Sequence, residues 1–181
     1  MVDPREELVE HIGAMRAFAI SLCRNGATAD DIVQDALIKA WSNIDSFQEG
    51  TNMRAWLFTI VRNTYFSLHR KRKREVEDVD GAMAESLSQK PDHDGRLALK
   101  DFAVAFDQLT DEQREALVLV GAQGFSYEEA AEMCGVALGT IKSRVNRARA
   151  QLAELMDLDD DEPIELTDAV TASIVQSQPA A

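Results

Sequence analysis

The sequence predicts an all-α protein built of two small helical domains joined by a flexible acidic linker. Apolar residues recur at helical spacing in several stretches, and alternating apolar and polar runs with hairpin dipeptides are absent. The length of 181 residues allows one ordinary domain or two small ones. We expect the domains at residues 1–74 and 96–156, the linker at 75–95 and an acidic tail at 157–181.

The first domain is expected to contain three helices. The first helix runs from an N-cap at Asp3 to Gly26. The second begins at Thr28 and has a broad apolar stripe that extends to Trp41 and beyond. The third follows a polar loop and ends in the basic run 70–74. Such a run is as typical of a solvated helix end as of a phosphate contact.

The third helix carries aromatic and cationic side chains opposite its apolar stripe. These residues are Phe58, Arg62, Tyr65, Phe66 and His69. Exposed rings beside cations can stack on unpaired bases, so single-stranded nucleic acid is one candidate partner. The alternative is that the rings pack on the first helix or on the second domain.

The second domain has clear helix boundaries. Capping boxes begin helices at Thr110 and Ser126, and the second of these helices ends at Gly135. A short turn leads into a last helix, and this layout is that of a helix-turn-helix. Its inward residues are Ile141, Val145, Ala148, Leu152 and Leu155.

The last helix has an outward polar face that suits a major groove. At 100° per residue, the residues pointing away from the apolar side are Lys142, Ser143, Asn146 and Arg147. Lys and Arg can donate to guanine, Asn can pair with adenine, and Ser can serve either base. Arg144 and Arg149 flank this face at angles suited to phosphate contact. The alternative is an ordinary solvated helix face.

The net charge of −13 reflects the linker and the tail. Residues 75–95 carry a net −6 and residues 151–181 a net −8, so the two remaining blocks together carry +1. Nucleic acid therefore stays a possible partner of the domains. In the tail, Leu166, Val170 and Ile174 recur every four residues and could form one or two docking helical turns, although a disordered, solubilising tail fits the composition better.

Several classes of function are excluded. The sequence has no apolar run of membrane-spanning length and no secretory signal, so we expect a cytoplasmic protein. Cys23 and Cys134 read as buried apolar residues. No catalytic triad, Gly-rich phosphate loop or metal cluster is present, so we expect no enzyme, cofactor or metal.

Three motifs resemble those of bacterial RNA polymerase sigma factors of the extracytoplasmic-function type. The motifs are Asp31-Ile-Val-Gln-Asp-Ala-Leu-Ile-Lys-Ala-Trp41, Arg54-Ala-Trp-Leu-Phe-Thr-Ile-Val-Arg-Asn63, and Gln113-Arg-Glu-Ala-Leu through to Arg149. The resemblance covers residues 5–155, and it implies two helical domains joined by a flexible linker. Within the family, residues 70–76 and 119–131 are similar to the EcfG-type general-stress-response group.

The resemblance implies a role for each site. Asp31, Gln34 and Asp35 would contact the clamp helices of the large subunit of core RNA polymerase, although helix capping by itself also explains Asp31. The minus-ten promoter element would be bound by Phe47, Arg62, Asn63 and Tyr65. The minus-thirty-five element would be read by Thr140, Lys142, Ser143, Arg144, Asn146, Arg147 and Arg149.

The resemblance also implies regulation. An anti-sigma factor of the NepR type would hold the free protein, a monomer, inactive. Two alternatives remain. A sigma-like decoy that binds only the anti-sigma factor would need a receiver domain and no polar recognition face. A helix-turn-helix repressor would be a stable dimer and would leave the first two motifs unexplained.

Overall fold

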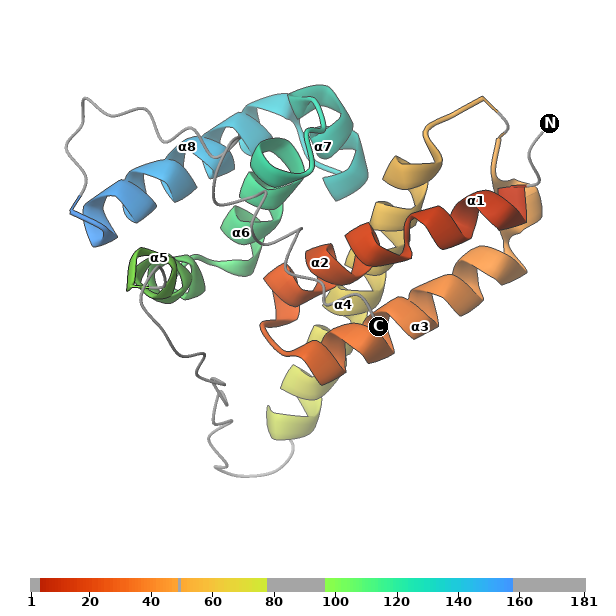
Figure 1. The fold of residues 1–181 in the computed structure, drawn as a ribbon, viewed down its shortest axis with the longest axis horizontal. Helices are drawn as coiled ribbons and strands as arrows, with labels where there is room; N and C mark the ends of the chain where they lie inside the picture. Colours follow the sequence, from red (N-terminus) through yellow and green to blue (C-terminus); the bar gives the residue numbers. More distant parts are fainter. Residues whose placement is uncertain (1–3, 49, 78–96, 158–181) are drawn as a thin grey trace. The chain divides into compact units, whose positions relative to one another are not determined.

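The computed structural model describes residues 4–48, 50–77 and 97–157, and this part of the chain is helical without strands (Figure 1). The chain divides into two compact units, Met1–Gln89 and Lys90–Ala181. The predicted all-α class is confirmed. Most of the predicted linker and nearly all of the predicted tail lie outside the described residues, so the domain boundaries stay predictions.

The described part of the first unit is a small helical bundle. Its elements are α1 (Pro4–Glu10), α2 (Ile12–Cys23), α3 (Gly26–Ser42), the 3-10 turn η1 (Ile44–Ser46) and α4 (Met53–Glu77). Helices α2, α3 and α4 pack against one another. The core therefore lies among these three helices, with Met15, Phe18, Ile32 and Leu57 fully buried.

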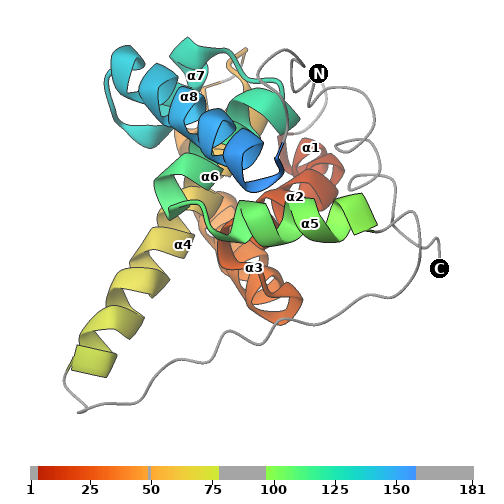
Figure 2. The same cartoon turned by 90° about the vertical axis from the view of Figure 1, so that its left-hand side faces the viewer.

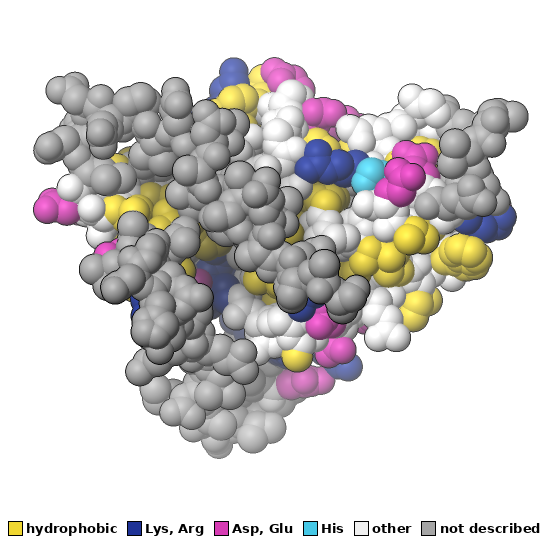
Figure 3. Space-filling model, in the orientation of Figure 1, with side chains coloured by type: hydrophobic (Ala, Val, Ile, Leu, Met, Phe, Trp, Pro, Cys, Tyr) yellow, Lys and Arg dark blue, Asp and Glu magenta, His cyan; other side chains and the backbone are white. Residues whose placement is uncertain are grey.

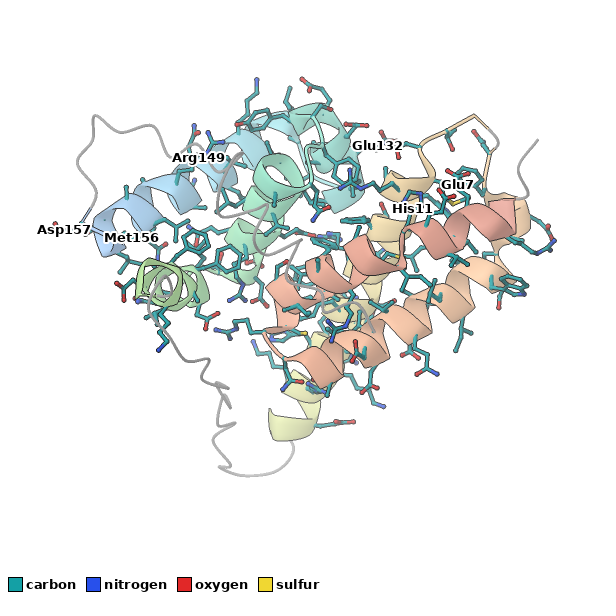
Figure 4. All side chains as sticks on the ribbon, viewed as in Figure 1. Glu7, His11, Glu132, Arg149, Met156 and Asp157 are labelled. Atoms are coloured by element: carbon teal, nitrogen blue, oxygen red, sulfur yellow. The ribbon has the colours of Figure 1, made fainter. Side chains whose placement is uncertain are left out.

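Two boundaries in the first unit differ from the sequence-based expectation. The first helix is broken at His11, which lies beside Glu7, with His11 Nε2 3.8 Å from a Glu7 carboxylate oxygen (Figure 4). Helix α3 begins at Gly26 rather than at Thr28. Its N-cap is Asn25, whose side chain accepts a hydrogen bond from Thr28 N at 2.9 Å.

Helix α4 is buried over a wide arc. Its buried residues are Met53, Leu57, Phe58, Val61, Thr64 and Tyr65. At 100° per residue they cover an arc of about 140°, because α4 packs on both α2 and α3. Phe58 stacks on Phe18 of α2 with ring centroids 4.9 Å apart.

The C-terminal turns of α4 extend beyond the other helices of the first unit (Figure 2). The helix continues through Glu77, into the range expected for the linker. All five residues of the basic run 70–74 are exposed, and Lys71 Nζ lies 3.9 Å from Glu75 Oε1. The extension thus presents cations to solvent on every side of the helix.

The described part of the second unit contains α5 (Leu97–Asp107), α6 (Asp111–Leu117), the π-helical turn η2 (Val118–Ala122), α7 (Tyr127–Cys134) and α8 (Leu138–Leu155). Both predicted capping boxes are present, at Thr110 and at Ser126. Helix α8 packs on α5, α6 and α7. It is therefore the central helix of this unit.

The core of the second unit includes two charged side chains from α6. Arg114 is 1% exposed and Glu115 is fully buried. Arg114 Nη2 donates a hydrogen bond to Asp111 Oδ1 of the same helix. This local pairing offsets part of the cost of burying the guanidinium.

Candidate nucleic-acid interface

The helix-turn-helix of the second unit is set by local hydrogen bonds and one glycine. Ser126 Oγ accepts from Glu129 N at 3.1 Å, and Ser126 N donates to Glu129 Oε2 at 2.8 Å, which together start α7. Gly135 ends α7 with φ at 65°, a left-handed conformation that a side chain would strain. The chain then turns into α8 within three residues.

Helix α8 separates an apolar face from a polar one as predicted. Ile141, Val145, Ala148 and Leu152 are fully buried. Leu155 was expected to point inward but is 40% exposed, because it lies in the last turn beyond the packed part of the helix. The opposite side, which we call the recognition face, consists of Thr140, Lys142, Ser143, Asn146 and Arg147.

The recognition face is available to a ligand. Thr140, Lys142, Asn146 and Arg147 are exposed, and Ser143 is half-buried. Ammonium, guanidinium, amide and hydroxyl groups lie side by side on adjacent turns. They supply the donors and acceptors that base edges offer in complementary form in a major groove.

Two arginines flank the recognition face and are only half-buried. Arg144 Nη1 and Arg149 Nε are both shielded from solvent without a hydrogen-bond partner among the described residues. Arg149 lies in the middle turns of α8 (Figure 4). An anion that approaches α8, such as a phosphate, could supply the missing acceptors.

An open pocket of about 300 Å³, lined mostly by polar residues and hereafter called the polar cavity, lies in the first unit. Its walls come from α3, η1 and α4, and the lining residues are Lys39, Asn43, Ser46, Trp56, Ile60, Asn63, Thr64 and Ser67. Lys39 Nζ donates to Thr64 Oγ1 at 3.0 Å, which links α3 to α4 at the wall. Amides and hydroxyls beside an indole ring suit a flat, polar group such as a nucleobase.

The structure brings together three of the four residues expected to bind the minus-ten element. Asn63 lines the polar cavity, and Arg62 Nη1 donates to Asn63 Oδ1 at 3.2 Å. Phe47 lies against Trp56 of the cavity wall with ring centroids 5.4 Å apart. Tyr65, by contrast, is only 7% exposed.

The expected exposed aromatic stripe on α4 is therefore wrong for two of its rings. Phe58 is fully buried against Phe18 of α2, which lies in the predicted first helix, so the alternative of packing on that helix is confirmed for this ring. Tyr65 packs edge to face on Phe66 and stacks on His69. The guanidinium of Arg62 lies 4.8 Å from the centroid of Phe66.

The outward side of α3, which we call the α3 face, joins acidic and apolar residues. Asp31, Gln34 and Asp35 are all exposed, as a contact with a partner requires. Ile38 and Trp41 lie on the same side of the helix at 58% and 57% exposure. The predicted apolar stripe of this helix includes Trp41, but placing Trp41 in the core is wrong. The buried residues of α3 are Ala29, Ile32, Val33, Ala36 and Ala40.

The apolar part of the α3 face was missed by the sequence analysis. Figure 3 shows hydrophobic side chains gathered over the C-terminal half of α3. Arg5 lies over the Trp41 ring at 5.4 Å from its centroid. Counted from Ala29, whose burial the structure shows, the 100° rotation per residue places both apolar residues on the outward side.

Asp30 is engaged within the first unit, unlike its neighbour Asp31. Arg16 Nε donates to Asp30 Oδ1 at 2.6 Å. This hydrogen bond, together with the charge attraction, raises the pKa of the Arg16 guanidinium. Since the N-cap of α3 is Asn25, neither aspartate is needed to cap the helix, and Asp31 forms no hydrogen bond or ion pair with other described residues.

Within the described ranges, no group of three or more His, Cys, Asp or Glu side chains is placed to hold a metal ion. No helix in the same ranges has the length and apolar character needed to cross a bilayer.

Comparisons with known proteins match both units. Residues 8–75 match the model of Sigma-70 region 2, and residues 99–152 match that of Sigma-70, region 4. The ECF RNA polymerase sigma factor EcfG of Rhodopseudomonas palustris is 52% identical over 170 residues, which cover 94% of each chain.

Two solved structures are also similar. The sigma factor RpoE of Bartonella quintana, in complex with the anti-sigma factor NepR, is 54% identical with a TM-score of 0.77, covering 85% of this chain and 96% of that one. A chain of the PhyRSL–NepR complex from Sphingomonas sp. Fr1 has the same fold, with a TM-score of 0.65 at 21% identity, covering 87% of this chain and 92% of that one.

Proposed function

Because this chain belongs to the extracytoplasmic-function family of RNA polymerase sigma factors, we propose that its two units divide the recognition of a promoter between them. The chain binds core RNA polymerase and directs initiation at specific promoters. In the proposed division, the first unit docks on the polymerase and captures the minus-ten element, and the second reads the minus-thirty-five element. The observation that carries this division is the recognition face, whose exposed polar side chains form no hydrogen bond or ion pair with other described residues.

The second unit reads duplex DNA through the recognition face. Lys142 and Arg147 donate to guanine edges, Asn146 pairs with adenine, and Thr140 and Ser143 accept or donate as the base requires. Arg144 and Arg149 bind phosphates, which position α8 without reading sequence. The unpaired guanidinium nitrogens of these two arginines support this role.

The first unit captures an unpaired base of the minus-ten element in the polar cavity. Extracting a base costs a few kcal/mol, which stacking and hydrogen bonds at the base edge repay. Asn63 supplies the edge hydrogen bonds, and Phe47, together with Trp56, supplies aromatic surface at the cavity. Arg62 orients the Asn63 amide, and Tyr65 holds this stretch of α4 in place from its buried position.

The α3 face docks on the clamp helices of the large polymerase subunit. Asp31, Gln34 and Asp35 provide charge and hydrogen bonds. Ile38 and Trp41 provide the apolar area that a stable interface needs at its centre, and Trp is among the residues most enriched there. The combination explains why large apolar side chains on this face stay exposed in the free protein.

The chain itself supplies promoter specificity to the polymerase. It contributes no catalytic step, cofactor or metal. It acts in the cytoplasm, where RNA polymerase works. The 54% identity to a sigma factor held by NepR, and the similarity to EcfG, support a role in the general stress response under an anti-sigma factor of the NepR type. The free chain is a monomer that one inhibitor molecule contacts on both units.

Transcription reconstituted from purified components tests this function. Core polymerase is combined with this chain on a template that carries an EcfG-type promoter, and run-off transcripts are measured. We expect specific initiation that depends on both promoter elements. If a relative of this family directs initiation under the same conditions and this chain does not, the proposal fails.

The repressor alternative is tested by the mass of the free chain in solution. A sigma factor of this architecture is expected at the mass of one chain, whereas a repressor is expected as a stable dimer. A decoy that binds only an anti-sigma factor would bind NepR and fail in the transcription assay.

A further inference from the structure

We propose that the acidic segment 158–181 binds the recognition face of α8 in its own chain and competes there with DNA. The proposal rests on the assignment of α8 as the DNA-reading helix. It goes beyond that assignment because it makes promoter access depend on a segment outside both matched sigma regions, which end at residue 152. Residues 158–181 would occupy the recognition face, and duplex DNA would compete for the same face through its phosphate backbone.

Helix α8 carries an unbalanced positive surface. Its cations are Lys142, Arg144, Arg147 and Arg149, and its one acidic residue is Glu154 near the other end. No carboxylate of the described residues forms an ion pair with any of these four cations. Two of the guanidinium groups also have a shielded nitrogen without a hydrogen-bond partner in the same part of the chain. This surface of α8 therefore has positive charge and hydrogen-bond donors with which it can bind an anion.

The segment that follows α8 has the opposite charge. Residues 158–181 contain six acidic residues and neither Lys nor Arg. Four of the six are consecutive, at 159–162, and begin only four residues after α8 ends. A polyanion covalently attached beside a cationic helix resembles, in charge, the DNA backbone that the helix is built to meet.

The geometry allows the segment to reach the recognition face. Asp157, labelled at the end of α8 in Figure 4, has a φ of 51°, a left-handed conformation that turns the chain away from the helix path. At 1.5 Å per residue, Arg147 lies about 15 Å and Lys142 about 22 Å back along α8 from this point. Eight extended residues span about 26 Å, so residues 158–165 are long enough to run back to Lys142.

Attachment to the same chain makes a weak contact effective. A short flexible connection gives an effective concentration in the millimolar range, so a contact with a Kd of about 0.3 mM would lower DNA affinity by roughly tenfold. The contact is electrostatic and solvent-exposed, so it weakens as salt rises. When the chain is bound to core polymerase on a promoter with both elements, the combined contacts would displace the segment from the recognition face. Isolated duplex DNA, without those contacts, would bind the chain poorly.

The test uses the full chain and a fluorescent random-sequence duplex of about 24 base pairs. One variant neutralises the tail with Asp159→Asn, Asp160→Asn, Asp161→Asn and Glu162→Gln. A matched control makes the same change of charge in the linker with Asp80→Asn, Glu85→Gln, Asp92→Asn and Asp94→Asn. We expect the tail variant to bind the duplex about tenfold more tightly than the natural chain at low salt, and the control less than twofold.

A second measurement does not depend on DNA. A labelled peptide of residues 158–181 is titrated with the tail-neutralised chain, without and with Lys142→Ala and Arg147→Ala added. We expect saturable binding that the two substitutions remove. Equal duplex affinity in the tail and linker variants, or peptide binding that ignores the recognition face, would overturn the proposal. If no variant binds duplex while the peptide still binds, the DNA-reading assignment fails and the docking contact stands.

Discussion

Removal of Arg147 gives the sharpest test of the recognition face. The side chain is exposed and has no intramolecular partner in the described part of the chain, so Arg147→Ala should change the free energy of unfolding by less than about 0.5 kcal/mol. A bidentate contact to a base is worth about 1–3 kcal/mol of discrimination. Binding of the minus-thirty-five duplex should therefore weaken about 5- to 160-fold at fixed salt.

Two matched variants separate base reading from plain loss of charge. Lys100→Ala removes one exposed cation that lies on α5 of the same unit and not on α8, and it should weaken binding less than twofold. Arg147→Lys keeps the charge but loses the planar fork, so it should retain non-specific affinity and lose preference for the natural sequence. Fluorescence anisotropy on natural and base-substituted duplexes measures both. A loss for Arg147→Ala that equals the loss for Lys100→Ala would refute the reasoning.

Three further predictions concern the α3 face, the capping box and the core. Trp41→Ala should weaken binding to core polymerase about 30-fold, a loss of about 2 kcal/mol, with an unchanged melting temperature; a similar loss for the equally exposed Val104→Ala of the second unit would argue against a local contact. Ser126→Ala removes the N-cap of α7 and should destabilise the second unit by about 1 kcal/mol, seen in calorimetry as a Tm about 4–8 °C lower, whereas an unchanged Tm would mean that the cap is dispensable. Phe58→Ala empties the space beside Phe18 and should cost about 3–5 kcal/mol in urea unfolding of the first unit; a cost near zero would contradict the packed ring stack.

Short-range signals in the sequence were sufficient to predict the helix-turn-helix of the second unit. The capping boxes at Thr110 and Ser126 and the stop at Gly135 depend on residues within four positions of each other, so the local sequence contains all of their partners. The split of α8 into a buried and a polar face also followed from the 3.6-residue period, because α8 buries one regular stripe. The polar residues at the centre of the candidate site were therefore found without the structure.

The sequence by itself thus determined the helical class, the helix-turn-helix and the outward set that includes Lys142 and Arg147, because each depends on spacing along a single helix. Only the tertiary structure decided which side of α3 and α4 is covered. Helix α4 packs on two neighbours and buries Phe58 and Tyr65, whereas α3 leaves Trp41 exposed. The polar cavity likewise joins Lys39 to Thr64, residues on different helices, and no spacing rule links side chains that meet only when the helices pack.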